Sequence, residues 1–156
     1  DLLGVENEVH AGRRNITNIG TLEATSTSLG IARRAYELTL DYARNRVQGG
    51  KPIIEHHLIS AMLLEMFTRL EASRTMAWRS ATSIDNGTND DPKLPRATKV
   101  MTVESLNFIT TKAVEIWGGM GVMKEAPIEK IYRDAIQLFH MGNTNQVNML
   151  KAFSDF

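Results

Sequence analysis

The chain has 156 residues, 18 acidic and 18 basic side chains that give zero formal net charge, and no cysteine. This length fits one domain, the balanced charge favours neither nucleic acid nor a membrane surface as a partner, and the missing cysteines exclude disulfides and thiol chemistry. The sequence has no run of 18 apolar residues, so we expect no membrane insertion.

Residues 20–46 predict the first long helix, after a mixed segment, 1–19, that shows no clear period. Gly49, Gly50 and Pro52 then break the pattern. Apolar residues recur in the helix at spacings of three, four and seven, which places them on one stripe. They are Leu22, Leu29, Ala32, Tyr36, Leu40 and Ala43.

Two more long helices are predicted at 54–86 and 94–117, joined by a polar loop after Asn86-Gly87. The expected buried residues are Leu58, Ile59, Met62, Leu63, Met66 and Leu70 in one helix, and Ala97, Val100, Met101, Leu106, Ile109, Ala113 and Ile116 in the other. Lys99 is assigned to the surface.

Short helices follow at 127–137 and about 144–153, and Asn143 or Thr144 is expected to cap the last one. Long amphipathic helices with short to moderate connections favour antiparallel neighbours. The sequence therefore predicts an all-α fold, an up-and-down four-helix bundle with short extra C-terminal helices.

The stretch from Ile116 to Gln146 reads IWGGMGVMKEAPIEKIYRDAIQLFHMGNTNQ and contains two glycine-rich breaks. A glycine pair after a long helix is by itself typical of a C-cap and a turn. The order and spacing of the whole set resembles the C-terminal helical domain of the flavin-dependent acyl-CoA dehydrogenases. The set is Gly-Gly-x-Gly, Pro-Ile-Glu-Lys, Tyr-Arg-Asp-Ala and Gly-x-Thr-x-Gln. The resemblance extends back to about Gly20. It implies that 20–156 form this FAD-binding and oligomerisation domain and that 1–19 are a linker from a missing N-terminal part.

The resemblance also implies FAD as the cofactor. Arg46 matches an arginine that reaches the pyrophosphate of a flavin held mainly by a neighbouring subunit, and its planar guanidinium suits a phosphate. Gly49 replaces the usual aromatic residue of the following turn. The other positions that match contacts to FAD or to the neighbouring subunit are His57 and Glu115, each in place of a glutamine, and Gly118, Gly119, Thr144 and Gln146.

The chemistry of the family needs a carboxylate base beside the α-proton of the thioester. The resemblance places that base at Gly142 or, in other members, at Gly20, where the next residue, a substrate-binding arginine, is Thr21 here. Neither position carries a base, so no catalytic residue is assigned. Glu23 is a weak candidate for a relocated base, and a solvated glutamate near a helix N-terminus is the alternative.

Two further groups carry charge or metal-binding atoms. His56 and His57 are adjacent, so on a helix they point about 100° apart and cannot both bind one ion, and we expect no metal site. Arg133 and Asp134 are interpreted as structural, pairing inside the bundle or across subunits.

The resulting hypothesis is the C-terminal domain of an oxidoreductase that acts on the CH–CH bond of acyl-CoA thioesters, inactive as an isolated chain. Acyl-CoA would bind through regions outside the chain. A homo- or hetero-oligomer, dimer or tetramer, is expected, in the cytoplasm or, in a eukaryote, in the mitochondrial matrix. The alternatives are a non-catalytic subunit of a heteromeric flavoenzyme and a helical scaffold without flavin.

Overall fold

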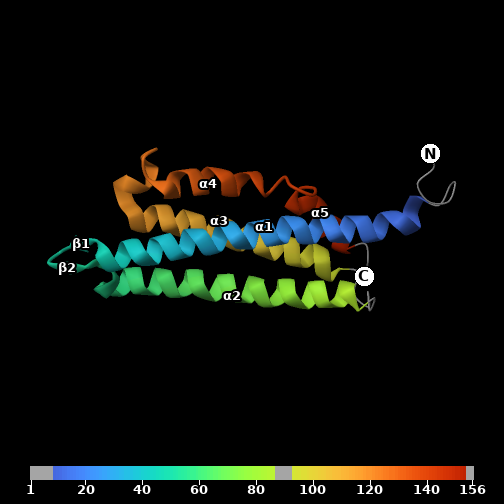
Figure 1. The fold of residues 1–156 in the computed structure, drawn as a ribbon, viewed down its shortest axis with the longest axis horizontal. Coiled ribbons are helices and arrows are strands. Elements are labelled where there is room, and N and C mark those ends of the chain that lie inside the picture. The colour runs from blue at the N-terminus through green and yellow to red at the C-terminus, as the bar shows by residue number, and fades with distance from the viewer. Residues whose placement is uncertain (1–8, 87–92, 154–156) are drawn as a thin grey trace.

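The computed structural model describes residues 9–86 and 93–153, with side chains described from Ile19 onward. Four helices run alternately up and down, and a fifth packs on α3 (Figure 1). They are α1 (Val9–Asn45), α2 (His57–Asp85), α3 (Leu94–Trp117), α4 (Pro127–Gln137) and α5 (Asn145–Phe153). The predicted all-α bundle with short extra C-terminal helices is confirmed.

Helix α1 begins at Val9, not at Gly20, so part of the expected linker 1–19 is helical. The remainder of that segment lies outside the described residues, as do Gly87 and most of the polar loop before α3. Three of the buried hydroxyl side chains in α1 each donate to the carbonyl four residues before them: Thr25 to Thr21 (2.8 Å), Ser28 to Ala24 (2.7 Å) and Thr39 to Ala35 (2.7 Å). These bonds accommodate poor helix formers inside a long helix.

A small hairpin follows α1 and was not predicted from the sequence. Its strands β1 (Val47–Gln48) and β2 (Lys51–Pro52) pair antiparallel, with Gln48 opposite Lys51. Gly49 and Gly50 form the turn at φ 64° and 81°. Positive φ at both central residues is what a two-residue hairpin turn of type I′ requires, and glycine meets it without strain. The short helix η1 (Ile53–Glu55) leads into α2.

The core lies where α3 packs against α1, α2, α4 and α5. Most of the predicted inward residues are buried, but Leu58 is 67% exposed. It lies five residues before Leu63, about 140° around the helix, so it does not share the inward row of α2. The most deeply buried large apolar residues are Met66, Val103, Leu106, Ile109 and Ile128.

The surface assignment of Lys99 is wrong, because the residue is completely buried. Helix α3 contacts every other helix of the bundle and η2 (Gly118–Val122), so little of its circumference faces solvent. Several of its polar residues are therefore buried, including Thr98, Thr102, Ser105 and Thr110. The amphipathic pattern of a single helix cannot predict such buried polar residues, because it is interpreted on the assumption that the polar face is solvated.

Candidate functional site

The predicted flavin-contacting residues fall into two groups at different levels of the bundle. We call the first the hairpin end, residues 45–57 and 115–123, which lies beyond the C-terminal ends of α1 and α3. The second group is Thr144 and Gln146, at the end of what we call the α4–α5 loop, residues 139–144, and at the start of α5. The loop lies against α1 near Gly20, and Gly20 and Arg46 are about 39 Å apart along the helix, from 26 residues at 1.5 Å each.

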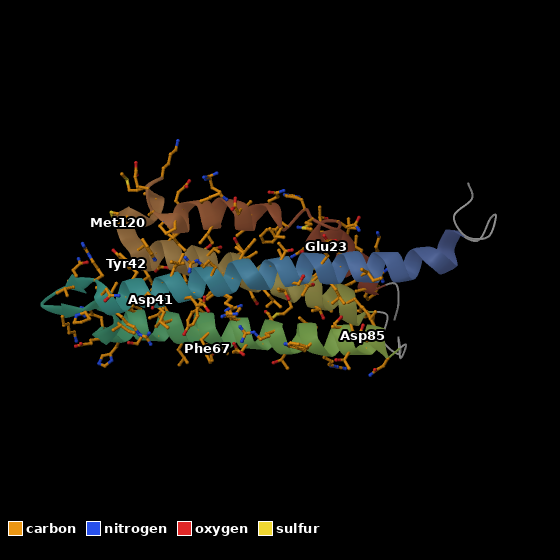
Figure 2. The ribbon with its side chains drawn as sticks, in the orientation of Figure 1. Glu23, Asp41, Tyr42, Phe67, Asp85 and Met120 are labelled. Carbon is orange, nitrogen blue, oxygen red and sulfur yellow. The ribbon has the colours of Figure 1, made fainter. Side chains whose placement is uncertain are left out.

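Arg46 is fixed at the hairpin end by its backbone. Its N–H donates to the Tyr42 carbonyl and its carbonyl accepts from Ile53 N–H, both at 2.8 Å, while its side chain is exposed. The ring of Tyr42 stacks on Trp117, with centroids 4.2 Å apart and an interplanar angle of 12°. This stack joins the end of α1 to the end of α3, and Tyr42 and Met120 lie at the same end in Figure 2. It therefore brings Arg46 to the end of the bundle where Gly118 and Gly119 lie.

The three glycines of Gly-Gly-Met-Gly have different physical roles. Gly118 ends α3 at φ 60°, a left-handed conformation that favours glycine. A Cβ on Gly121 would lie 2.6 Å from the Val114 carbonyl oxygen, so this position admits no side chain without a backbone shift. Gly119 is exposed and a Cβ there would meet nothing within 4 Å. Gly121 therefore serves packing, and Gly119 offers open backbone to a ligand or a partner.

Glu115 and His57, two of the three substituted positions of the hairpin end, are both solvent-facing. Glu115 accepts a hydrogen bond from Lys112 Nζ at 2.7 Å, so its carboxylate already has a cation beside it. His57 is exposed at the first residue of α2, whereas Nε2 of His56 lies 3.0 Å from the Gln48 carbonyl oxygen. The two histidines thus have different surroundings. Among the described residues there is no group of three or more metal-binding side chains.

Thr144 caps α5, as one of the two predicted alternatives: its Oγ1 accepts from Val147 N–H at 3.3 Å. Gln146, in the first turn, is exposed. Thr144, the last residue of the α4–α5 loop, and Gln146 are therefore both held at the N-terminus of α5.

Gly142 and Gly20, the two positions where the resemblance predicts a base, lie close together. A Cβ on Gly142 would lie 3.8 Å from the Gly20 carbonyl oxygen and 3.9 Å from Cβ of Ala24. These are ordinary contact distances, so a Cβ has room there, although φ 64° at Gly142 strains any residue other than glycine. The two alternative base positions, Gly20 and Gly142, are far apart in sequence but adjacent in the fold, and both are glycine.

Glu23 lies elsewhere on α1. It lines a groove of about 1000 Å³ between α1 and α2, together with Phe67 and Trp78, and Figure 2 labels Glu23 and Phe67 on those two helices. Ala24, its neighbour in sequence, is the residue that faces Gly142. The structure thus gives no direct contact between Glu23 and the empty base positions.

Lys99 is the residue near this place that sequence reasoning missed. Its Nζ donates to Asn145 Oδ1 at 2.8 Å and to the carbonyls of Asn143 at 3.0 Å and Phe139 at 3.5 Å. Burial lowers the pKa of Lys99. No pattern in the sequence singles it out, because its partners lie 40 to 46 residues away.

Arg133 and Asp134 form their ion pairs on the surface of α4, which corrects the expectation of pairing inside the bundle. Arg133 Nε lies 2.6 Å from Glu129 Oε1, and Lys130 pairs with Asp134. The hydrogen bond from Arg133 lowers the pKa of the Glu129 carboxyl. Both pairs join residues four apart on one helix. Pairing of Arg133 or Asp134 with another subunit therefore stays a prediction.

Comparison with known proteins agrees with this arrangement. The family model described as the acyl-CoA dehydrogenase C-terminal domain matches residues 15–152. The CarC subunit of a caffeyl-CoA reductase–Etf complex from Acetobacterium woodii is 33% identical over 148 residues, which is 95% of this chain and 39% of that protein. An acyl-CoA dehydrogenase from Bacillus subtilis is 35% identical over 151 residues, which is 96% of this chain and 39% of that protein.

Among solved structures, butyryl-CoA dehydrogenase from Megasphaera elsdenii superposes with a TM-score of 0.89 at 27% identity, covering 96% of this chain and 39% of the other. The chain thus spans about two fifths of the length of these proteins. In the described part of the chain, no helix is long and apolar enough to cross a membrane. The sequence motifs, the helical architecture and these matches agree, and the chain belongs to the acyl-CoA dehydrogenase family as its C-terminal helical domain.

Proposed function

We propose that this chain contributes FAD contacts and a subunit interface to an acyl-CoA dehydrogenase-like oxidoreductase that lacks the usual catalytic glutamate. One observation carries the proposal. Gly20 and Gly142 converge on the place where a base is expected, while Arg46, Gly118 and Gly119 remain exposed at the hairpin end.

The residues of the hairpin end are suited to the outer part of a flavin dinucleotide. Arg46 is exposed, and none of the described acidic residues forms an ion pair with it, so its guanidinium is available for a pyrophosphate. Gly119 lets backbone approach closely. Glu115 would repel a phosphate, but it is partly neutralised by Lys112 and can accept from a ribose hydroxyl or an adenine amine. When bound, FAD would supply the hydride acceptor for oxidation of an acyl-CoA.

The separation of the two groups favours an oligomer. About 39 Å along α1 is too long for Arg46 and the α4–α5 loop to hold the same end of one flavin. The two groups would therefore contact two different flavin molecules, or distant parts of one flavin. Either arrangement fits an assembly in which subunits share cofactors. The exposed Phe67 and Trp78 of the α1–α2 groove fit a protein in which further chain or another subunit covers this face. The cytoplasm or the mitochondrial matrix is proposed as the location.

Size-exclusion chromatography of the native protein, with flavin and protein absorbance followed together, tests the cofactor and the assembly. We expect a yellow peak of oligomer size. A colourless peak that stays colourless after addition of FAD would overturn the flavin proposal and favour the helical scaffold, for which Gly49, His57 and Glu115 are the supporting substitutions.

The absent base is tested by replacing Gly142 in the flavin-loaded protein that includes the acyl-CoA-binding regions proposed to lie outside this chain. Gly142→Glu puts a carboxylate at the position where a Cβ has room, and we expect it to gain acyl-CoA-dependent bleaching of the flavin. Gly142→Gln is the matched control, with the same size and no basic group. Bleaching of the wild-type flavin by acyl-CoA would show that a base is present elsewhere and would contradict this part of the proposal.

A second candidate function is a non-catalytic subunit of a heteromeric flavoenzyme. The relative from Acetobacterium woodii, which is named as a subunit of an Etf complex, favours it. This candidate predicts that a homologue with glutamate at a base position co-purifies with the chain. A homo-oligomer that carries flavin without such a partner would exclude it.

A further inference from the structure

The α4–α5 loop holds two consecutive residues in the left-handed region. Gly142 has φ 64° and Asn143 has φ 76°, and Asn143 is the one non-glycine residue with positive φ among those described. Such a backbone persists only where its surroundings hold it firmly. The loop also sets where α5 begins, and hence where Thr144 and Gln146 are presented. Its conformation therefore needs an identifiable support.

Lys99 provides that support from α3. An ammonium group has three donors, and Lys99 Nζ meets three acceptors: the Phe139 and Asn143 carbonyls, at the two sides of the turn, and Asn145 Oδ1 at the start of α5. A buried ammonium is costly unless all its donors are satisfied, so the bonds depend on this loop conformation. Since Lys99 is completely buried and its donors are used, it is not placed to act on a substrate.

Asn148 supports the same loop from α5. Its Nδ2 lies 3.2 Å from the Gly142 carbonyl oxygen, 3.3 Å from that of Asn143 and 3.1 Å from that of Thr144. The residue is 1% exposed. Asn143 O is thus approached by both Lys99 and Asn148, and the two side chains hold the left-handed turn from opposite helices.

We propose that Lys99 is a positioning residue that fixes the α4–α5 loop, so that Gly142 is held against Gly20 and Thr144 and Gln146 are presented for the cofactor. The part that concerns the cofactor rests on the proposed function. The part that concerns the loop does not, because it follows from the contacts of Lys99 alone.

Lys99→Met tests the loop, because it keeps an unbranched chain of similar length and removes the ammonium. The matched control is Lys130→Met, at a lysine whose side chain is 68% exposed on α4. Hydrogen–deuterium exchange of the full chain should become at least tenfold faster at the amides of residues 139–148, including His140 and Asn148, which donate to Gln137 and Thr144 carbonyls. Exchange in residues 63–80 of α2 should not change, and Lys130→Met should alter neither region.

Unchanged exchange at 139–148 would overturn the proposal, and so would equal acceleration in both regions, which indicates only lost global stability. If Lys99→Met does not fold, Asn145→Ala decides, because it removes one acceptor at 2.8 Å and leaves the ammonium in place. We expect from it a several-fold acceleration confined to 139–148. No acceleration would overturn the proposal.

The rate of flavin release from the holoprotein tests the link to the cofactor. We expect at least tenfold faster release from Lys99→Met and a wild-type rate from Lys130→Met. A loosened loop with unchanged flavin release would overturn the positioning role. If the wild-type protein holds no flavin, the proposed function fails, and the exchange experiment still decides whether Lys99 fixes the loop.

Discussion

The hairpin end and the α4–α5 loop are both built around glycines, but they are held in different ways. At the hairpin end, backbone hydrogen bonds and the Tyr42–Trp117 stack set the geometry, and the side chains proposed to bind a ligand point into solvent. In the α4–α5 loop, buried Lys99 and Asn148 hold the carbonyls from inside. The difference shows that similar glycine-rich motifs can depend on packing in one place and on buried hydrogen bonds in another.

The largest effect is expected at the hairpin end from Gly121→Ala. The new Cβ would lie 2.6 Å from the Val114 carbonyl oxygen, so the backbone must move, at a cost of about 2–3 kcal/mol in the free energy of unfolding. Urea denaturation measures this. Gly119→Ala, with nothing within 4 Å of its Cβ, should stay within about 0.5 kcal/mol of wild type. Equal effects of the two substitutions would contradict the assignment of packing to Gly121 alone.

Asn148→Ala should act on the loop with a somewhat smaller effect. It leaves three carbonyl oxygens without this donor, and we expect a loss of about 1–2 kcal/mol in the free energy of unfolding. Gln146→Ala, two residues away on the exposed side of α5, is the control for stability, with a change within about 0.5 kcal/mol. If Asn148→Ala did not change the free energy of unfolding, backbone packing and not this amide would hold the turn.

The two glycines that face each other should respond with opposite signs. Alanine at Gly142 must adopt φ 64°, which costs about 1 kcal/mol. Alanine at Gly20 stands inside α1 with nothing within 4 Å of its Cβ, and should gain about 0.5–1 kcal/mol. Thermal unfolding of both variants checks the pair. A stabilising Gly142→Ala would show that the loop changes its backbone readily, against the support ascribed to Lys99.

The smallest effect is a pH dependence from Lys99. Burial places its pKa in the fold below the ordinary value of 10.5. Between the two pKa values the unfolded chain binds more protons, so the free energy of unfolding rises with pH, by less than about 1.4 kcal/mol per pH unit. The advantage of wild type over Lys99→Met in urea unfolding should therefore grow as pH approaches 10.5 from neutrality. A constant or shrinking difference would contradict a depressed pKa.

Predictions from the sequence succeeded where local chemistry is enough. The bounds of α3 and α4, the cap at Thr144 and the stop at Gly118 follow from helical period, a hydroxyl at an N-cap and a glycine at a C-cap. The prediction that Leu58 is buried was wrong, because a short apolar run does not determine which residues of a helix's first turn face inward. The hairpin was not predicted, because strands of two residues are too short to show an alternation of apolar and polar side chains.

The sequence by itself determined the all-α fold and the family, since amphipathic period and motif order are properties of the chain as written. Only the tertiary structure decided which residues share a place: Gly20 with Gly142, Tyr42 with Trp117, and Lys99 with the loop forty residues on. The physical reason is that α3 is enclosed by the other helices. Lys99 lies on a part of α3 that faces the α4–α5 loop and the start of α5, so it is buried although its local pattern predicts the surface. Packing then selects its partners, because a buried ammonium must find acceptors.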